Sequence, residues 1–100
     1  TEKLKYLQDT LHRLGCELLV VLNPGKASYF PEYIPDEMKA QPTDQTNMKG
    51  YEASLNRYHV RHIDFYKWFN EQKTKTKYPL FPKYGIHWSH YADYVVADSL

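Results

Sequence analysis

The run CELLVVL, Cys16 to Leu22, decides the fold that this sequence predicts. A short and nearly continuous apolar run is typical of a strand that is covered on both faces, as in a parallel sheet. We expect the small thiol of Cys16 to be buried there. Asn23-Pro24-Gly25 follows directly and ends the strand.

The segment before this strand has the spacing of an amphipathic helix. Leucines recur at positions 4, 7, 11 and 14, which places them on one helical face, and Gly15 follows where a C-terminal cap belongs. A helix, a tight glycine turn, a buried strand and a loop together indicate an α/β fold with a parallel sheet and flanking helices. Ligands collect at the carboxyl ends of such strands, so residues 23–28 lie on the expected functional rim.

Beyond this rim the sequence predicts a long loop and a second helix and strand. Residues 29–50 are rich in proline and show no sustained period, which indicates a functional loop with one short helical turn. Residues 51–58 favour a helix. Residues 59–64 favour a less buried strand with His62 and Asp64 on one side.

Two more helices are expected in the last third of the chain. Asp64 is a suitable N-cap for a helix with the apolar face Phe65, Trp68, Phe69 and Gln72. Ser89 is a suitable N-cap for a helix whose inward residues are Ala92, Val95, Val96 and Leu100. A proline-broken loop separates the two helices.

Composition excludes several classes of protein. The 100 residues allow at most one domain, and 13 basic residues against 12 acidic ones give no electrostatic case for nucleic acid binding. The lysines of residues 73–77 are expected to be a solvated helix end. No apolar run is long enough to cross a membrane. Ten tyrosines suit a carbohydrate or protein surface, or half-buried structural positions.

Histidine pairs raise the question of a metal site. His59 and His62, like His87 and His90, are three residues apart, but a strand places the first pair on opposite faces, and no cysteine or carboxylate cluster completes a zinc signature. We expect no metal and no cofactor. From position alone, His87 is either a general base projecting from a loop or a polar residue at a helix start.

Two segments resemble a known family. The run YGIHWSHYADYVVADSL at residues 84–100, preceded by YPLFPK, resembles the Asp-x-His-Trp segment of an SGNH-hydrolase-like branch. That branch includes the alginate O-acetylation proteins and the DHHW proteins. The run LLVVLNPGKASYFPEY at residues 18–33 is similar to the strand and loop of the same branch.

The resemblance implies an α/β, flavodoxin-like fold of the SGNH type, in which His87 is the catalytic histidine and Trp88 follows it. Gly85 occupies the position where the family's triad carries Asp. Without that carboxylate the histidine tautomer is not fixed and the imidazolium is not stabilised. Either another acid replaces it, with Asp64 the nearest candidate by strand topology, or this chain is a weakened or non-catalytic relative.

The resemblance places the nucleophilic serine downstream of Leu100. Ser99 in ADSL differs from the Gly-Asp-Ser-Leu block of SGNH esterases by one residue, but the expected helix runs through it and the turn glycine is missing. Lys26, which follows a Pro-Gly turn, is expected to bind substrate or to be exposed. Trp88 and Tyr91 are the other substrate-binding candidates.

These expectations combine into one functional hypothesis and one alternative. The chain starts at Thr1 without Met, and we expect residues 1–100 to be a single partial SGNH-like domain of a longer protein. The resemblance implies a periplasmic or cell-envelope serine esterase or O-acetyltransferase acting on acetylated polysaccharide, with this piece inactive alone. The alternative is a non-catalytic module that contacts a carbohydrate or protein partner through Tyr29, Tyr33, Trp88 and Tyr91.

Overall fold

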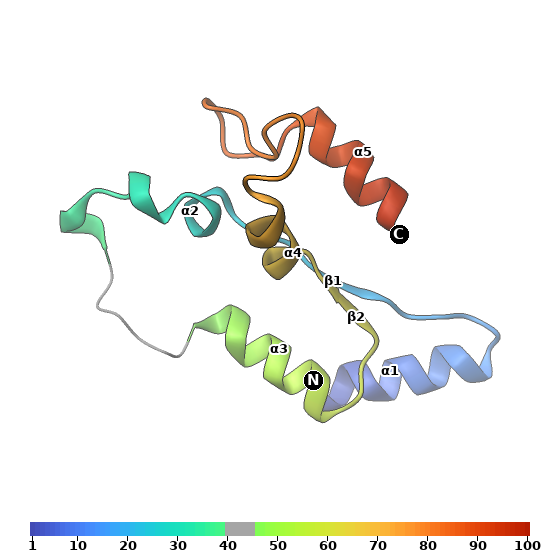
Figure 1. Ribbon diagram of the computed structural model, residues 1–100. Coiled ribbons are helices and arrows are strands. Elements are labelled where there is room, and N and C mark those ends of the chain that lie inside the picture. Colours follow the sequence, from blue (N-terminus) through green and yellow to red (C-terminus); the bar gives the residue numbers. More distant parts are fainter. Residues whose placement is uncertain (40–45) are drawn as a thin grey trace. The chain divides into compact units, whose positions relative to one another are not determined.

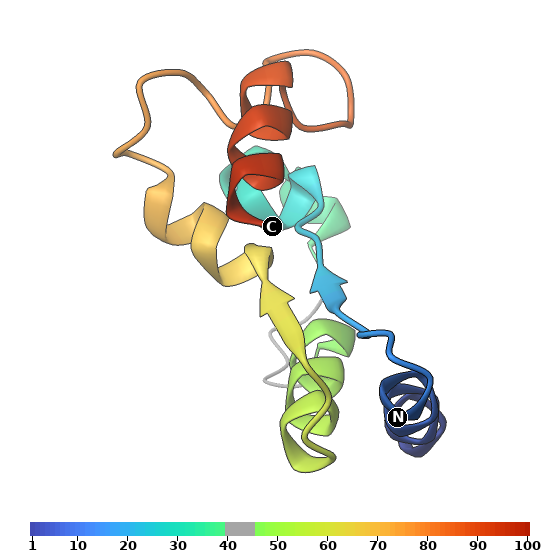
Figure 2. The same cartoon turned by 90° about the vertical axis from the view of Figure 1, so that its right-hand side faces the viewer.

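Two short parallel strands lie side by side in the computed structural model, which describes residues 1–39 and 46–100 (Figures 1 and 2). Strand β1, Val20–Leu22, pairs with β2, His62–Asp64, so that Val21 lies opposite Ile63. Helices flank both strands in the chain order. The predicted α/β fold with a parallel sheet and flanking helices is therefore confirmed, with a sheet of two strands in the described residues.

The described residues form two units. The first comprises residues 1–22 and 46–64, and the second comprises residues 23–39 and 65–100. Each strand of the first unit ends where the chain enters the second, since Asn23 follows β1 and Phe65 follows β2.

Both helices of the first unit end in the same hydrogen-bonded turn. Helix α1, Glu2–Arg13, is followed by Gly15 at φ +77°, and the Cys16 N–H donates to the Leu11 carbonyl at 2.9 Å. Helix α3, Asn47–Arg57, is followed by His59 at φ +52°, and its turn closes in the same way. Glycine is favoured at such a left-handed position, so His59 stores strain that Gly15 does not.

Two strand predictions were wrong in their extent. Residues 59–61 are not in a strand, because the Val60 N–H donates to the Leu55 carbonyl at 2.9 Å and thereby completes the turn that ends α3. Strand β1 can pair only where β2 exists, so it begins at Val20 rather than at Cys16. The Cys16 thiol, expected to be buried, is exposed. The strand residues themselves are half-buried.

The side chain of Gln8 joins α1 to the turn before β2. Its amide nitrogen donates to the His59 carbonyl at 3.2 Å, and its amide oxygen accepts from the Arg61 N–H at 2.7 Å. Gln8 is buried, so both of its hydrogen bonds form away from water. The leucine face of α1 is less covered than its spacing suggests, because Leu7 and Leu14 are exposed.

The second unit contains most of the apolar core. Its elements are α2, Lys26–Tyr29, two short 3₁₀ helices, Pro31–Tyr33 and Asp36–Met38, then α4, Phe65–Gln72, and α5, His90–Ser99. Phe65, Phe69, Leu80 and Ala92 are at most 2% exposed. Burying a large apolar side chain contributes about 1.5–3 kcal/mol, so this cluster holds the unit together.

Helix α5 begins as the sequence predicts. The Ser89 hydroxyl accepts a hydrogen bond from the Ala92 N–H at 3.2 Å, which satisfies one of the free donors at the helix start. Ala92 and Val96 face the core, but Leu100, also expected to face inward, is exposed because it follows the last turn of the helix.

Candidate active site around His87

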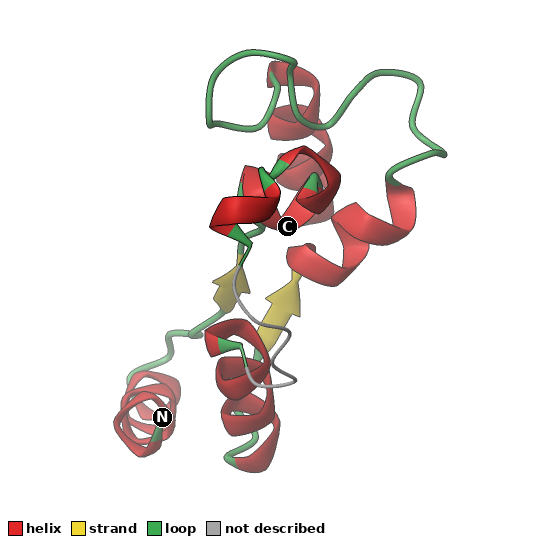
Figure 3. Ribbon diagram, turned by 90° about the vertical axis from the view of Figure 1, so that its left-hand side faces the viewer, coloured by secondary structure: helices red, strands yellow, loops and turns green. Residues whose placement is uncertain are grey.

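His87 lies in the loop between α4 and α5, drawn in green in Figure 3. Leu80 and Phe81 anchor the base of this loop in the core. Ser89 fastens its other end, since its N–H donates to the Leu80 carbonyl at 2.8 Å and its hydroxyl donates to the Pro79 carbonyl at 2.7 Å. His87 is therefore two residues from a fixed point.

The tip of the loop turns at Gly85. Its φ of +82° lies in the left-handed region, where glycine is favoured. The ammonium of Lys26, from α2, donates to the Gly85 carbonyl at 2.7 Å and to the Lys83 carbonyl at 3.0 Å. The structure thus places Lys26 beside the loop that carries His87, residues 73–89, within the second unit. We call this segment the histidine loop.

The His87 side chain is exposed, and its imidazole has a defined hydrogen bond. Nδ1 lies 3.2 Å from the carbonyl oxygen of Trp88. A carbonyl only accepts hydrogen bonds, so this contact requires the proton on Nδ1 and leaves the lone pair of Nε2 available. Among the described residues, His87 forms no ion pair with a carboxylate.

Three neighbouring side chains contact the ring of Trp88. Its ring packs at a tilt on buried Phe69, with centroids 5.6 Å apart, and meets the His87 ring edge-on at 5.4 Å. Its indole N–H donates to one carboxylate oxygen of Asp93, whose other oxygen lies 3.4 Å from His90. Asp93, which the sequence analysis did not single out, therefore fixes the ring that precedes α5.

The remaining substrate-binding candidates lie elsewhere in the same unit. Tyr91 is half-buried, with its ring 5.3 Å from that of Tyr78 in an edge contact. Lys26 borders a pocket of about 500 Å³. The pocket is mainly apolar, and its other lining residues are Phe30, Tyr33, Pro79, Phe81, Pro82 and Lys83.

Lys73 was expected to be part of a solvated helix end, and the structure corrects this. Its ammonium donates to the Tyr29 carbonyl at 2.5 Å and to Glu32 at 3.1 Å. It also lies 4.9 Å from the centre of the Tyr29 ring and 4.8 Å from that of Phe30. Helix α4 ends at Gln72, one residue earlier, so the side chain of Lys73 returns to α2 instead of extending into solvent.

Two pKa values respond to this arrangement. The Glu32 pKa is lowered, first by a hydrogen bond from its own backbone N–H and then by Lys73. The Tyr29 pKa is raised, first by burial and then by the Glu32 charge. Tyr29 is only 2% exposed, so it cannot serve as the contact surface that the module hypothesis assigned to it.

Two other predictions concern catalysis by groups outside the loop. Ser99 lies in the last turn of α5, and its hydroxyl donates to the Val95 carbonyl at 2.7 Å. This is helical geometry, and it lacks the sharp turn that exposes a nucleophilic serine. Within residues 1–39 and 46–100, no group of three His, Cys, Asp or Glu side chains is placed to hold a metal ion.

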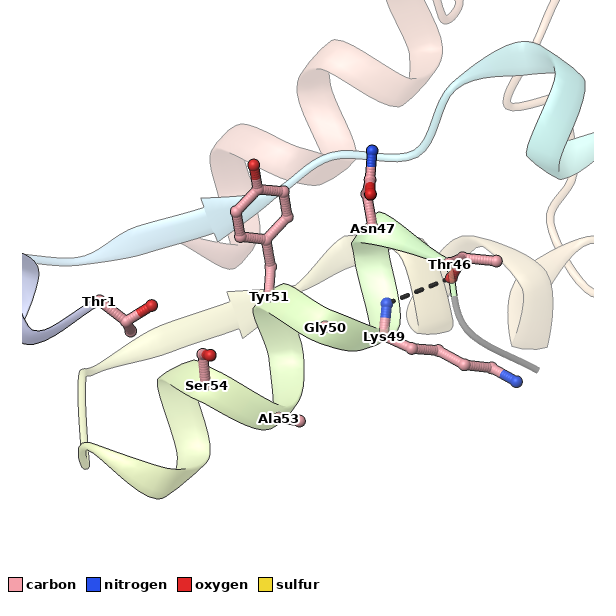
Figure 4. A pocket seen from close by; sticks show the side chains of 8 residues that line it. All are labelled: Thr1, Thr46, Asn47, Lys49, Gly50, Tyr51, Ala53 and Ser54. Carbon is pink, nitrogen blue, oxygen red and sulfur yellow. Dashed lines mark hydrogen bonds between the residues drawn. The ribbon is translucent and has the colours of Figure 1, made fainter. Parts of the chain in front are cut away.

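A second pocket, of about 680 Å³, belongs to the first unit (Figure 4). It is lined by Thr1 and by the first part of α3, where the Thr46 hydroxyl accepts from the Lys49 N–H at 3.3 Å. The described residues that line it include hydroxyls such as Ser54 but neither a histidine nor a carboxylate. These described lining residues therefore lack the histidine and the carboxylate of a Ser-His-Asp triad.

Comparison with protein families identifies the family to which this chain belongs. A family model described as "SGNH hydrolase-like domain, acetyltransferase AlgX" matches residues 1–100. The chain belongs to this AlgX family. The predicted SGNH-like fold and the predicted resemblance are thereby confirmed. No curated protein and no solved structure matches the sequence. In the described part of the chain, no helix of the AlgX-like domain is long and apolar enough to cross a membrane.

Proposed function

We propose that this chain supplies the general base of a serine-dependent acetyl transfer on carbohydrate, and that His87 is that base. The observation that supports it most is the hydrogen bond from His87 Nδ1–H to the Trp88 carbonyl. It fixes one tautomer and leaves Nε2 free on an exposed loop. Membership of the AlgX family, whose description names an acetyltransferase, supports acetyl transfer as the reaction.

In this mechanism the nucleophilic serine lies outside residues 1–100. Its hydroxyl oxygen bonds to the acetyl carbonyl carbon while His87 Nε2 takes the hydroxyl proton. The ester C–O bond then breaks, and His87 returns the proton to the departing alcohol, which leaves an acetyl-serine. A sugar hydroxyl or a water then attacks the acetyl carbon while His87 accepts its proton. The bond between the acetyl carbon and the serine oxygen breaks, and His87 returns the proton to that oxygen, which restores the free serine.

Substrate contacts are proposed for Lys26, Trp88 and Tyr91. An ammonium has three N–H donors, and Lys26 uses two of them on the histidine loop, which leaves one for a sugar oxygen. The apolar pocket beside Lys26 provides space for a sugar ring. We further propose that residues 1–100 are one part of a larger SGNH domain in an extracytoplasmic protein whose substrate is an acetylated polysaccharide.

Gly85 favours a second candidate function. A backbone carbonyl can orient His87, but it stabilises the imidazolium less than the triad carboxylate that Gly85 replaces, and loss of that carboxylate costs several orders of magnitude in rate. The alternative is therefore a module that keeps the SGNH fold and binds a carbohydrate or a protein without catalysis.

The experiment compares hydrolysis of a chromogenic acetate ester by the full-length protein and its His87→Ala variant. General base catalysis contributes roughly 10²–10⁴-fold, and we expect a loss of that size. His90→Ala is the matched control, because His90 is also exposed and lies three residues away, paired with Asp93. An active protein that keeps its activity in His87→Ala would rule out His87 as the base, and a wild-type protein without esterase activity would favour the module.

A further inference from the structure

The tip of the histidine loop has little packing of its own. Tyr84 is 78% exposed and Ile86 is 90% exposed, and Lys83, Gly85 and His87 are also exposed. Neither buried side chains nor regular secondary structure fix the path of the chain here. A segment of this kind opens readily unless hydrogen bonds hold it.

Lys26, in contrast, starts from a well-anchored element. Pro24 is buried just before it, and Tyr29, the last residue of α2, is buried with its ring 5.0 Å from that of Phe81. The Tyr29 N–H donates to the Gly25 carbonyl at 3.1 Å, and this bond closes the helical turn that contains Lys26. The backbone of Lys26 is therefore held on the core of the second unit.

We propose that Lys26 is the positioning residue of the histidine loop. Its two hydrogen bonds reach the carbonyls on either side of Tyr84, at Lys83 and Gly85. They hold the peptide unit between Lys83 and Tyr84, before the left-handed turn at Gly85, and the peptide unit between Gly85 and Ile86, after it. That turn sets the direction in which the chain reaches His87.

This role differs in its kinetics from the substrate contact proposed above, and its catalytic part rests on the proposed function of His87. A displacement of about 1 Å in a catalytic group costs roughly a hundredfold in rate. Loss of a positioning residue lowers kcat with little change in KM, whereas loss of a substrate contact that is equally strong in the ground and transition states raises KM.

Limited trypsin digestion of the full-length protein tests the positioning directly, because one susceptible bond follows Lys83, whose carbonyl accepts from Lys26. In Lys26→Met, which keeps an unbranched apolar side chain, we expect cleavage after Lys83 to be roughly tenfold faster or more. Lys73→Met is the matched control, since it removes another lysine of the same unit that bonds to Tyr29 and Glu32 instead of the loop.

The outcomes separate the two proposals. Unchanged cleavage after Lys83 in Lys26→Met, or equal acceleration in Lys73→Met, would overturn the positioning role whether or not the protein is an esterase. Faster cleavage in Lys26→Met alone supports it. In an active protein, a fall in kcat in Lys26→Met supports the link to His87, and loss of the substrate contact proposed above accounts for any rise in KM that accompanies it. An unchanged kcat would contradict the link to His87. Failure of the His87→Ala test would overturn the proposed function and the catalytic part of the Lys26 role, and would leave the positioning of the loop by Lys26 to the digestion experiment.

Discussion

Replacing Ser89 by Ala is expected to destabilise the second unit by about 2 kcal/mol. The hydroxyl makes two hydrogen bonds, one accepted from the Ala92 N–H at 3.2 Å and one donated to the Pro79 carbonyl at 2.7 Å. Loss of a serine N-cap costs about 1 kcal/mol, and loss of a further hydrogen bond costs about 0.5–1.5 kcal/mol. The backbone bond from Ser89 N–H to the Leu80 carbonyl remains in the variant.

Urea unfolding monitored by tryptophan fluorescence measures this effect. Trp68 and Trp88, the two tryptophans of the chain, both lie in the second unit, so the signal reports that unit. Ser89→Thr keeps both bonds and should stay within about 0.5 kcal/mol of the wild type. Ser89→Asp keeps the cap but cannot donate a hydrogen bond to the Pro79 carbonyl, so its free energy of unfolding should lie between those of Ser89→Thr and Ser89→Ala. A loss below about 0.5 kcal/mol in Ser89→Ala would refute the reasoning.

Three further predictions follow from charge and backbone geometry. The lowered Glu32 pKa means that its ionised form is stabilised in the folded state, so Glu32→Gln should be less stable than wild type at about pH 7. This difference in stability should disappear as the pH falls through the lowered pKa, because the carboxyl group is then protonated in both the folded and the unfolded state. Urea titrations that give a pH-independent difference would contradict this. Gly85→Asp places an acid where the family's triad carries one, and it should have an esterase kcat roughly tenfold or more above that of Gly85→Asn. Gly85→Asn is the control because it has similar backbone strain and no charge. Equal rates in the two variants would show that the carboxylate does not reach His87. His59→Gly should stabilise the first unit by about 0.5–1 kcal/mol in thermal unfolding followed by circular dichroism, while His59→Ala, which keeps the strain, should not.

The sequence predicted the elements of the fold better than their lengths. Gly15 marks the end of α1 because glycine is the residue expected at a left-handed position. The same turn after α3 was missed because His59 occupies that position, and the residues after it were assigned to a strand. Strand β1 was predicted too long because its length depends on where its partner, β2, begins. The hydrophobic pattern of one segment carries no information about where the partner strand begins.

The site residues that belong to a short sequence motif could be predicted from the sequence. His87 was found through the family's segment, and Ser89 through the chemistry of helix caps. The partners of Lys26 lie 57 and 59 residues away, and no local pattern connects them. Lys73 could not be told apart from the other lysines of its run, because its role comes from α2 returning to the end of α4.

The central claim is that His87 takes the proton when an acetyl-serine forms, and the rate of acetylation tests it most directly. The full-length protein is mixed with a chromogenic acetate ester, and the covalent acetyl adduct is followed by mass spectrometry. We predict that the adduct forms at similar rates in wild type and His90→Ala, and about a hundredfold or more slowly in His87→Ala. Equal rates of adduct formation in wild type and His87→Ala would contradict the account.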